Sequence, residues 1–312
     1  MDPQSPPPGL EGAVVAIGNF DGVHRGHAAV IKRAEALALD MQRPCAVLTF
    51  EPHPTDFFRG PGSIFRLTPR DAKARVLARL GIDGMIVVSF NAALASLPAE
   101  AFIAEILVRR LGVSAVIAGY DFHFGAGRTG TPAFLKEAGT RYGFKVEIVE
   151  RIASDAAGST EAASSTATRA ALEEGDVDHA RHLLGHPFSI RGKVIHGQKL
   201  GRTLGFPTAN LLPDPSCRLR HGIYAVRVQI DDELDGKAYD GVANYGRRPT
   251  VDDGAALLEV FLFDFSSDLY GKVIEVEFWG WIRGEEKFPS LDALKAQIDA
   301  DAVRAREMLA TS

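Results

Sequence analysis

Two histidines three residues apart, His24 and His27, combine a residue type and a spacing that suit phosphoryl chemistry. They belong to the segment GNFDGVHRGH, residues 18–27, in which three glycines allow the backbone to approach a ligand closely. Imidazole N–H groups can donate hydrogen bonds to the charge that develops on a phosphoryl group, and such preorganised donors lower the barrier to its transfer. The segment is therefore predicted to bind a phosphate; the alternative is a pair of partly exposed loop histidines.

The sequence on either side of this segment predicts the elements that position it. Residues 13–17 form an apolar run typical of a buried strand, and residues 28–39 carry apolar side chains about every 3.6 positions, as in an amphipathic helix. The histidines would thus lie where a strand leads into a helix. The N-terminus of a helix offers unpaired N–H groups and the positive end of its dipole, which together favour a bound anion.

Later apolar runs alternate with helical patterns and extend the same arrangement. The further strands are expected at 45–50, 84–88, 115–119 and 145–149. Runs that are continuously apolar indicate strands covered on both faces, so we expect a parallel sheet between two layers of helices. Ligands of such sheets bind beyond the carboxyl ends of the strands.

Two more polar loops follow predicted strands, EPHP at 51–54 and GYDFHFGAGRTG at 119–130. Because parallel strands end at the same edge of a sheet, these loops and the histidine segment are expected to converge on one cleft. The second loop interleaves charged with aromatic residues, which suits an aromatic, charged ligand. His53 of EPHP has two readings, a substrate contact or a side chain that only stiffens a proline turn.

A stretch of small residues, 153–163, is expected to be a linker to the segment SSTATR, residues 164–169. Ser164 or Ser165 is a candidate N-cap of the helix that follows. Arg169 lies about one turn further, where its guanidinium could reach an anion at the helix start. A capped helix without a ligand explains the same residues.

From residue 185 the pattern changes to short alternating runs broken by Gly and Pro, at 188–194, 224–230, 238–243, 257–263 and 273–278. This spacing predicts a compact antiparallel barrel or sandwich, with a helix over 291–309 packed against it. Glu259 is the one charged residue of the run 257–263. It is either a functional carboxylate or a residue on the solvent face of an edge strand.

Composition narrows the class of protein. A chain of 312 residues suits two domains, and a net charge of −5 argues against a large nucleic-acid surface. No apolar run approaches the roughly 20 residues that cross a bilayer. The two cysteines are too few for a disulfide framework or a four-ligand zinc site. We therefore expect a cytoplasmic protein with small-molecule ligands, no nucleic-acid or membrane partner and an undetermined oligomeric state.

Taken together, the histidine segment, GYDFHFG and SSTATR resemble the nucleotidyltransferase superfamily with an H-x-G-H signature. GRTLGFPTANL (201–211), HGIYAV, GVANYGRRPT and LEVFLFDFSSDLYGK resemble riboflavin kinase. In this order the two halves resemble the bacterial bifunctional riboflavin kinase and FAD synthetase family, over nearly the whole chain after residue 12.

The acidic, proline-rich N-terminal sequence predicts a disordered tail at 1–12. The resemblance implies a Rossmann-like FMN adenylyltransferase domain with a parallel sheet at 13–184, and an antiparallel β-barrel riboflavin kinase domain with a C-terminal helix at 185–312. It implies phosphorylation of riboflavin to FMN and adenylylation of FMN to FAD with release of pyrophosphate. Both reactions would consume ATP with Mg²⁺. The adenylyl transfer would proceed by in-line attack without a covalent enzyme intermediate.

The resemblance also implies residue roles. Glu259 would be the base on the riboflavin hydroxyl, and Thr208 and Asn210 of PTAN would bind Mg²⁺ and ATP phosphates through oxygens that suit a hard cation. His24 and His27 would stabilise the transferring phosphates. The remaining ATP- or phosphate-binding residues would be Gly18, Asn19, Gly26, Asp121, Ser165, Thr166, Arg169, Gly201 and Gly205. Flavin contacts are expected from His53, Phe122 and Arg283. The chain departs from its relatives at Ala167, where a second basic residue is common.

The sequence leaves two alternative functions, the first also an enzyme and the second from a different functional class. One is an adenylyltransferase for another phosphorylated metabolite, with a barrel that only binds flavin. The PTAN segment and Glu259 argue against it. The other is a flavin- or nucleic-acid-binding module without turnover, and the negative net charge disfavours nucleic acid.

Overall fold

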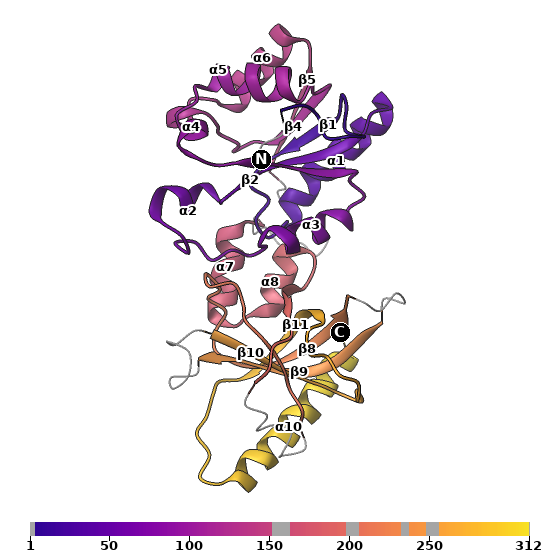
Figure 1. Cartoon of the computed structure of the whole chain (residues 1–312), viewed down its shortest axis with the longest axis vertical. Helices are drawn as coiled ribbons and strands as arrows, with labels where there is room; N and C mark the ends of the chain where they lie inside the picture. Colours follow the sequence, from indigo (N-terminus) through magenta and orange to yellow (C-terminus); the bar gives the residue numbers. More distant parts are fainter. Residues whose placement is uncertain (1–3, 152–162, 198–205, 232–236, 248–255, 312) are drawn as a thin grey trace. The chain divides into compact units, whose positions relative to one another are not determined.

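The structure, a computed structural model, describes residues 4–151, 163–197, 206–231, 237–247 and 256–311. The chain divides into two compact units (Figure 1). The first contains residues 1–64 and 68–164, and the second contains residues 65–67 and 165–312. A three-residue segment from the first half of the sequence therefore belongs to the second unit.

The first unit is built on a five-stranded parallel sheet in the order β3-β2-β1-β4-β5. Its strands are β1 (Val14–Ile17), β2 (Cys45–Glu51), β3 (Gly84–Ser89), β4 (Ala115–Gly119) and β5 (Lys145–Val149). All four residues of β1 are buried, as expected for a strand covered on both faces. The predicted α/β fold with a parallel sheet is confirmed.

Helices cover both faces of this sheet (Figure 1). Val14 and Ala16 pack against α1 (Arg25–Met41) and α3 (Arg70–Ala78) on one face. Val15 and Ile17 pack on the other face against the π-type helix η1 (Phe102–Arg110) and α6 (Pro132–Tyr142). The short helices are α2 (Pro54–Arg59), α4 (Ala92–Ala95), α5 (Ala99–Ala101) and η2 (Ala126–Arg128).

The N-terminal segment differs from the expected disordered tail. Leu10 is 7% exposed and belongs to the core cluster that also contains Val15 and Ile17. Its side chain lies so close to Gly84 that a Cβ at that glycine would be 2.7 Å from Leu10 Cδ1. Burial of an apolar side chain next to β3 holds this part of the segment on the sheet.

The second unit is a six-stranded antiparallel sheet in the order β6-β11-β8-β9-β10-β7. Its strands are β6 (Phe188–Lys193), β7 (Ala209–Leu211), β8 (Gly222–Ile230), β9 (Ala238–Arg247), β10 (Ala256–Leu262) and β11 (Val273–Arg283). An isolated bridge between Ile195 and Asn210 joins the segment after β6 to β7. Because β6 and β7 are the two edge strands, this bridge curls the sheet toward a closed barrel, as predicted.

Helices pack on both faces of the second sheet as well. One face forms a core with α7 (Ser165–Glu174) and α8 (Val177–Leu184), to which Leu172, Leu184 and Val226 contribute. The other face packs Ala225 and Val242 against Leu309 of α10 (Leu291–Ala310). The predicted C-terminal helix and its contact with the sheet are confirmed.

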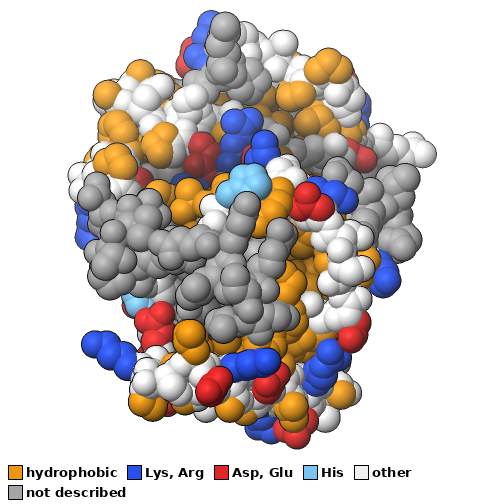
Figure 2. All heavy atoms as spheres, turned by 60° about the horizontal axis from the view of Figure 1, so that its bottom comes forward, with side chains coloured by type: hydrophobic (Ala, Val, Ile, Leu, Met, Phe, Trp, Pro, Cys, Tyr) orange, Lys and Arg blue, Asp and Glu red, His pale blue; other side chains and the backbone are white. Residues whose placement is uncertain are grey.

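Charged side chains of both signs are interspersed on the face shown in Figure 2. Two exposed ion pairs involve residues of α10, with Nη1–carboxylate distances of 3.0 Å for Arg304–Glu307 and for Arg306–Asp264. Exposed pairs of this kind contribute little to stability. Among the helices in the described ranges, none combines the length and the apolar character that a bilayer span requires.

Candidate active sites

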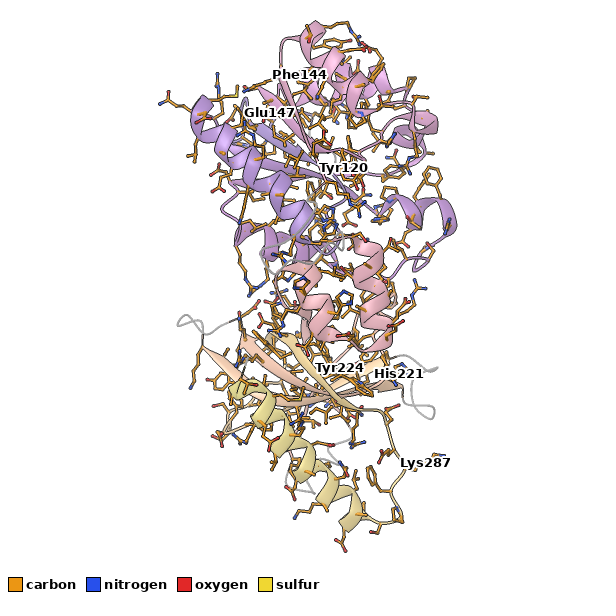
Figure 3. The ribbon with its side chains drawn as sticks, turned by 180° about the vertical axis from the view of Figure 1, so that it is seen from behind. Tyr120, Phe144, Glu147, His221, Tyr224 and Lys287 are labelled. Carbon is orange, nitrogen blue, oxygen red and sulfur yellow. The ribbon has the colours of Figure 1, made fainter. Side chains whose placement is uncertain are left out.

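The strand order of the first unit reverses between β1 and β4, which are neighbours in the sheet. Parallel sheets covered by helices bind ligands beyond the carboxyl ends of the strands at such a reversal. The three polar loops follow β1, β2 and β4, which are adjacent parallel strands, so they leave the same edge of the sheet. That they converge on one cleft stays a prediction. Figure 3 shows Tyr120, the first residue after β4, at this edge, and Phe144, which precedes β5, at the opposite edge.

The loop after β1 adopts a backbone conformation that few sequences tolerate. Phe20, Gly22 and Val23 have φ angles of 49°, 86° and 44°. A left-handed conformation is unusual for a β-branched residue such as Val23. The Phe20 and Val23 side chains are each only 1% exposed, so their packing holds the loop in this shape. Strained conformations that the surrounding structure enforces are concentrated at functional sites.

Two hydrogen bonds with Thr68 hold the same loop in place. The Thr68 N–H donates to Asp21 Oδ1 at 3.0 Å, and its Oγ1 accepts from the N–H of Gly22 at 2.8 Å. Asp21 and Thr68 are both buried. A buried carboxylate is stabilised by such donors, so the loop is preformed.

His24 and His27 lie at the N-terminus of α1, as predicted. His24 is the N-cap, and its Nδ1 accepts a hydrogen bond from the backbone N–H of His27 at 3.3 Å. Because Nδ1 accepts, a neutral His24 carries its proton on Nε2, which is then a donor. The two rings are stacked with centroids 3.6 Å apart, and the His27 ring meets the Phe20 ring edge-on at 5.2 Å. The pair of stacked rings lies at the positive end of a helix.

Gly26 and Gly18 lie in closely packed surroundings. A Cβ at Gly26 would lie 3.1 Å from His24 Cε1 and 3.6 Å from the carbonyl oxygen of Ala163. A Cβ at Gly18 would lie 3.3 Å from the Phe20 ring. Asn19, between them in the loop, has an exposed side chain that a ligand can reach.

Lys73 is a buried residue of this site that the sequence reasoning missed. It lies on α3 and is 1% exposed. Its ammonium Nζ donates to the carbonyl oxygen of Asn19 at 2.9 Å. The same Nζ lies 3.3 Å from the Thr49 hydroxyl and 3.3 Å from Glu51 Oε1. Lys73 thus ties the loop after β1 to the end of β2.

His53 and the loop after β4 have local roles in the structure. His53 is buried and caps α2, with its Nδ1 accepting from the N–H of Thr55 at 3.1 Å. This favours the reading in which His53 stiffens the turn. Asp121 is exposed, and its carbonyl oxygen lies 2.9 Å from Nδ1 of His123. Phe122 stacks on the buried Phe124 ring, with centroids 5.5 Å apart.

Ser165, Thr166 and Arg169 lie on α7, which begins at Ser165 and so puts Ser164 in the N-cap position. The three residues belong to the second unit. The Arg169 Nε donates to the carbonyl oxygen of Phe65 at 2.7 Å, also within that unit. Their assignment as phosphate ligands stays a prediction.

A row of polar side chains crosses three strands of the second unit. Glu259 on β10 faces Asn210 of β7 on one side and Asn244 of β9 on the other. Residues paired in this way project from the same face of a sheet. The edge-strand reading of Glu259 is wrong, because β10 is paired on both sides.

The residues of this row fit a hard cation. Asn210 is 3% exposed, and within the described ranges its Oδ1 is a buried atom that accepts no hydrogen bond, while its Nδ2 donates to the Thr208 carbonyl at 3.3 Å. Amide, hydroxyl and carboxylate oxygens are the ligands that Mg²⁺ prefers. A Cβ at Gly197 would lie 2.5 Å from Asn210 Nδ2, so the glycine makes room for this side chain. Gly201 and Gly205 lie outside the described residues.

In the described parts of the chain, no group of three or more His, Cys, Asp or Glu side chains is arranged to hold a metal ion. Thr208 and Asn210 are of other residue types, so their assignment as Mg²⁺ ligands stays a prediction.

Arg283, whose expected flavin contact stays a prediction, makes a buried ion pair. Its Nε and Nη2 donate to the Asp301 carboxylate at 2.9 and 2.7 Å, and its Nη1 donates to the carbonyl of Gly284 at 2.9 Å. Asp301 is 4% exposed and also accepts from Gln297. A two-pronged arginine–carboxylate pair is strong and directional, so this contact ties α10 to β11.

Comparison with known proteins identifies both halves. The family model described as FAD synthetase matches residues 7–166, and the riboflavin kinase model matches residues 184–309. Proteins named bifunctional riboflavin kinase/FMN adenylyltransferase are similar over nearly the full length. The one from Pseudomonas fluorescens is 44% identical over 98% of this chain and 96% of its own, and the one from Haemophilus influenzae is 43% identical over 95% and 94%.

A solved structure shares the fold. A crystal structure titled macrolide-efflux protein, from Streptococcus pneumoniae, has a TM-score of 0.83 and 32% sequence identity to this chain. The match covers 98% of this chain and 97% of that one.

Proposed function

The chain belongs to the family of bifunctional riboflavin kinases/FMN adenylyltransferases, and we propose on that premise how its residues divide the two reactions. It phosphorylates riboflavin to FMN and adenylylates FMN to FAD, with ATP as the second substrate in both steps. We assign the adenylyltransferase to residues 13–184 and the kinase to residues 185–312, in keeping with the two stretches that the family models match.

In the kinase reaction, Glu259 acts as the general base. Its carboxylate takes the proton of the terminal hydroxyl of riboflavin while that oxygen attacks the γ-phosphorus of ATP, and ADP leaves. Thr208 and Asn210 hold Mg²⁺, which neutralises charge on the ATP phosphates when it is bound. The register that puts Glu259 directly beside Asn210 supports this assignment.

In the adenylyl transfer, His24 and His27 act as hydrogen-bond donors. The FMN phosphate attacks the α-phosphorus of ATP and pyrophosphate leaves, so no protein nucleophile is needed. The His24 Nε2–H and the start of α1 stabilise the charge on the phosphates. Gly18, Asn19 and Asp121, all in the first unit, are proposed as further contacts to ATP. The preformed loop supports a mechanism of positioning and electrostatics.

The observation that carries the division of labour is that the histidine pair and the Glu259 row belong to different units. Glu259→Gln is expected to abolish FMN formation and to leave FAD formation from added FMN unchanged. His27→Ala is expected to do the reverse. Products from riboflavin, ATP and Mg²⁺ are separated by chromatography, with Glu286→Gln, at an exposed position, as the matched control.

Two results would contradict the proposal. The wild-type protein could form neither product, or one folded variant could lose both activities. We also propose that the protein acts on small-molecule substrates alone and that it works in the cytoplasm. Cell fractionation tests the location.

A further inference from the structure

We propose that Asn244 orients the acceptor in the kinase site, because its side-chain oxygen accepts a hydrogen bond from a hydroxyl of the riboflavin ribityl chain. The inference rests on the proposed kinase reaction and adds a residue to it. Asn244 lies on β9 within the segment GVANYGRRPT.

The sheet register places Asn244 next to the base. Asn244 and Glu259 are directly paired between β9 and β10, and Asn210 is paired with Glu259 on the other side. Neighbouring strands are about 4.8 Å apart, so the two asparagines flank the carboxylate with about 10 Å between their backbones. Both amides therefore project beside the group that takes the hydroxyl proton.

The Asn244 oxygen needs a donor. Its Oδ1 is buried and, within the described parts of the chain, accepts no hydrogen bond. A buried acceptor without a donor is costly for the folded state. A substrate O–H group supplies the missing donor, so the free protein holds an acceptor ready for it.

The order of residues along the row indicates which part of the substrate meets Asn244. Asn210, on one side of Glu259, belongs to the proposed Mg²⁺ and phosphate contacts. On the other side, the row continues past Asn244 to its partner Ile223 on β8. Ile223 packs against the apolar cluster that contains Val242 and Phe263.

The row thus begins with Asn210, a proposed ligand of Mg²⁺ and phosphate, and continues with Glu259, the proposed general base. The amide of Asn244 and the apolar side chain of Ile223 follow. Riboflavin phosphorylation presents phosphates, a terminal hydroxyl, further hydroxyls and an aromatic ring in the same order. Asn244 therefore corresponds to the further hydroxyls rather than to the cation.

The test uses the full-length protein with Asn244→Leu, which has nearly the same shape without the oxygen. Riboflavin binding is followed by quenching of tryptophan fluorescence. Trp279 and Trp281, the two tryptophans of the chain, both lie on β11 in the second unit. The Kd for riboflavin is expected to rise about tenfold, which corresponds to about 1.4 kcal/mol.

Two further measurements make the result specific. The Kd for a flavin that carries a methyl group in place of the ribityl chain is expected to stay unchanged, and so is the Mg²⁺ concentration for half-maximal kinase activity. Asn244→Asp keeps an acceptor oxygen and should bind riboflavin more tightly than Asn244→Leu. Asn91→Asp, at a helix cap in the first unit, is the control for an asparagine change elsewhere.

A shift in the Mg²⁺ dependence with unchanged riboflavin affinity would overturn the proposal, since the amide would then serve the cation. Equal loss of both flavins would also overturn it, as would unchanged affinity for both. If circular dichroism shows that Asn244→Leu is unfolded, Asn244→Asp and an Asn244→Ser variant decide the same comparison. Failure of the wild-type protein to form FMN would refute the proposed function instead.

Discussion

Replacing Lys73 with Met is expected to destabilise the first unit and to impair FAD formation while leaving the kinase intact. The substitution keeps an unbranched side chain of similar length in the buried position and removes only the ammonium. That ammonium donates to the Asn19 carbonyl at 2.9 Å and lies 3.3 Å from Glu51 Oε1. Its loss therefore releases the loop that carries the histidines from the end of β2.

The contacts set the size of the effect. Breaking a buried ion pair by removing one partner costs about 3–5 kcal/mol. The Glu51 side chain is 19% exposed, so water replaces part of the lost interaction. We expect a loss of about 2–4 kcal/mol in the free energy of unfolding of the first unit. A displacement of about 1 Å in the loop would lower the rate of adenylyl transfer about 100-fold.

Hydrogen exchange measures the stability locally, on peptides that contain β1 and β2, with peptides from β8 as the internal reference. FAD formation from added FMN and FMN formation from riboflavin give the two activities. Lys32→Met on the exposed side of α1 is the matched control. Combined with Glu51→Gln, the variant completes a double-mutant cycle, in which we expect a coupling free energy of about 1–3 kcal/mol between Lys73 and Glu51.

Unchanged exchange in β1 and β2 together with wild-type FAD formation would refute this reasoning. A coupling near zero would show that the 3.3 Å contact with Glu51 is not the interaction that matters.

Three further predictions concern other contacts. Gly26→Ala puts a methyl group 3.1 Å from His24 Cε1, so FAD formation should fall about 10- to 100-fold with little change in FMN formation. Asp301→Asn weakens the pair with Arg283, so the second unit should lose about 1–3 kcal/mol of stability in urea unfolding followed by tryptophan fluorescence. Burial, with smaller contributions from nearby carboxylates, raises the pKa of the Cys45 thiol to about 12. Its thiolate should therefore be scarce at pH 8, and iodoacetamide should label it only after urea is added.

Much of the architecture follows from local sequence pattern. The apolar runs locate the strands of the parallel sheet, and the helical period of residues 28–39 locates most of α1. The residue types at 18–27 mark a ligand loop, because the glycines let the backbone approach a ligand closely and the histidines can donate hydrogen bonds to it. These properties act over a few residues, so one sequence contains them.

The parts that could not be predicted depend on contacts between distant residues. Lys73 has one local signal, since it shares a helix face with the buried Val76 and Leu77, but its partners lie in the loop after β1 and on β2. The proposed role of Asn244 depends on the strand register that pairs it with Glu259, and this register is not visible in the local sequence. The row of Asn210, Glu259 and Asn244 comes from three strands whose pairing no short window of sequence determines.

The segment 65–67 has a consequence for how the protein is made. Phe65 is fully buried in the core of the second unit, where its ring meets that of Phe188 with centroids 5.8 Å apart. During synthesis, residues 65–67 leave the ribosome roughly one hundred residues before α7. Their side chains can therefore be buried in the second unit's core only after the rest of that unit has been synthesised. A kinase half expressed alone from residue 165 would lack Phe65 and Leu67, and losing one such aromatic side chain from a core costs about 3–5 kcal/mol. The segments of the two units therefore alternate along the sequence, and a continuous stretch that begins at residue 165 contains only part of the second unit's core.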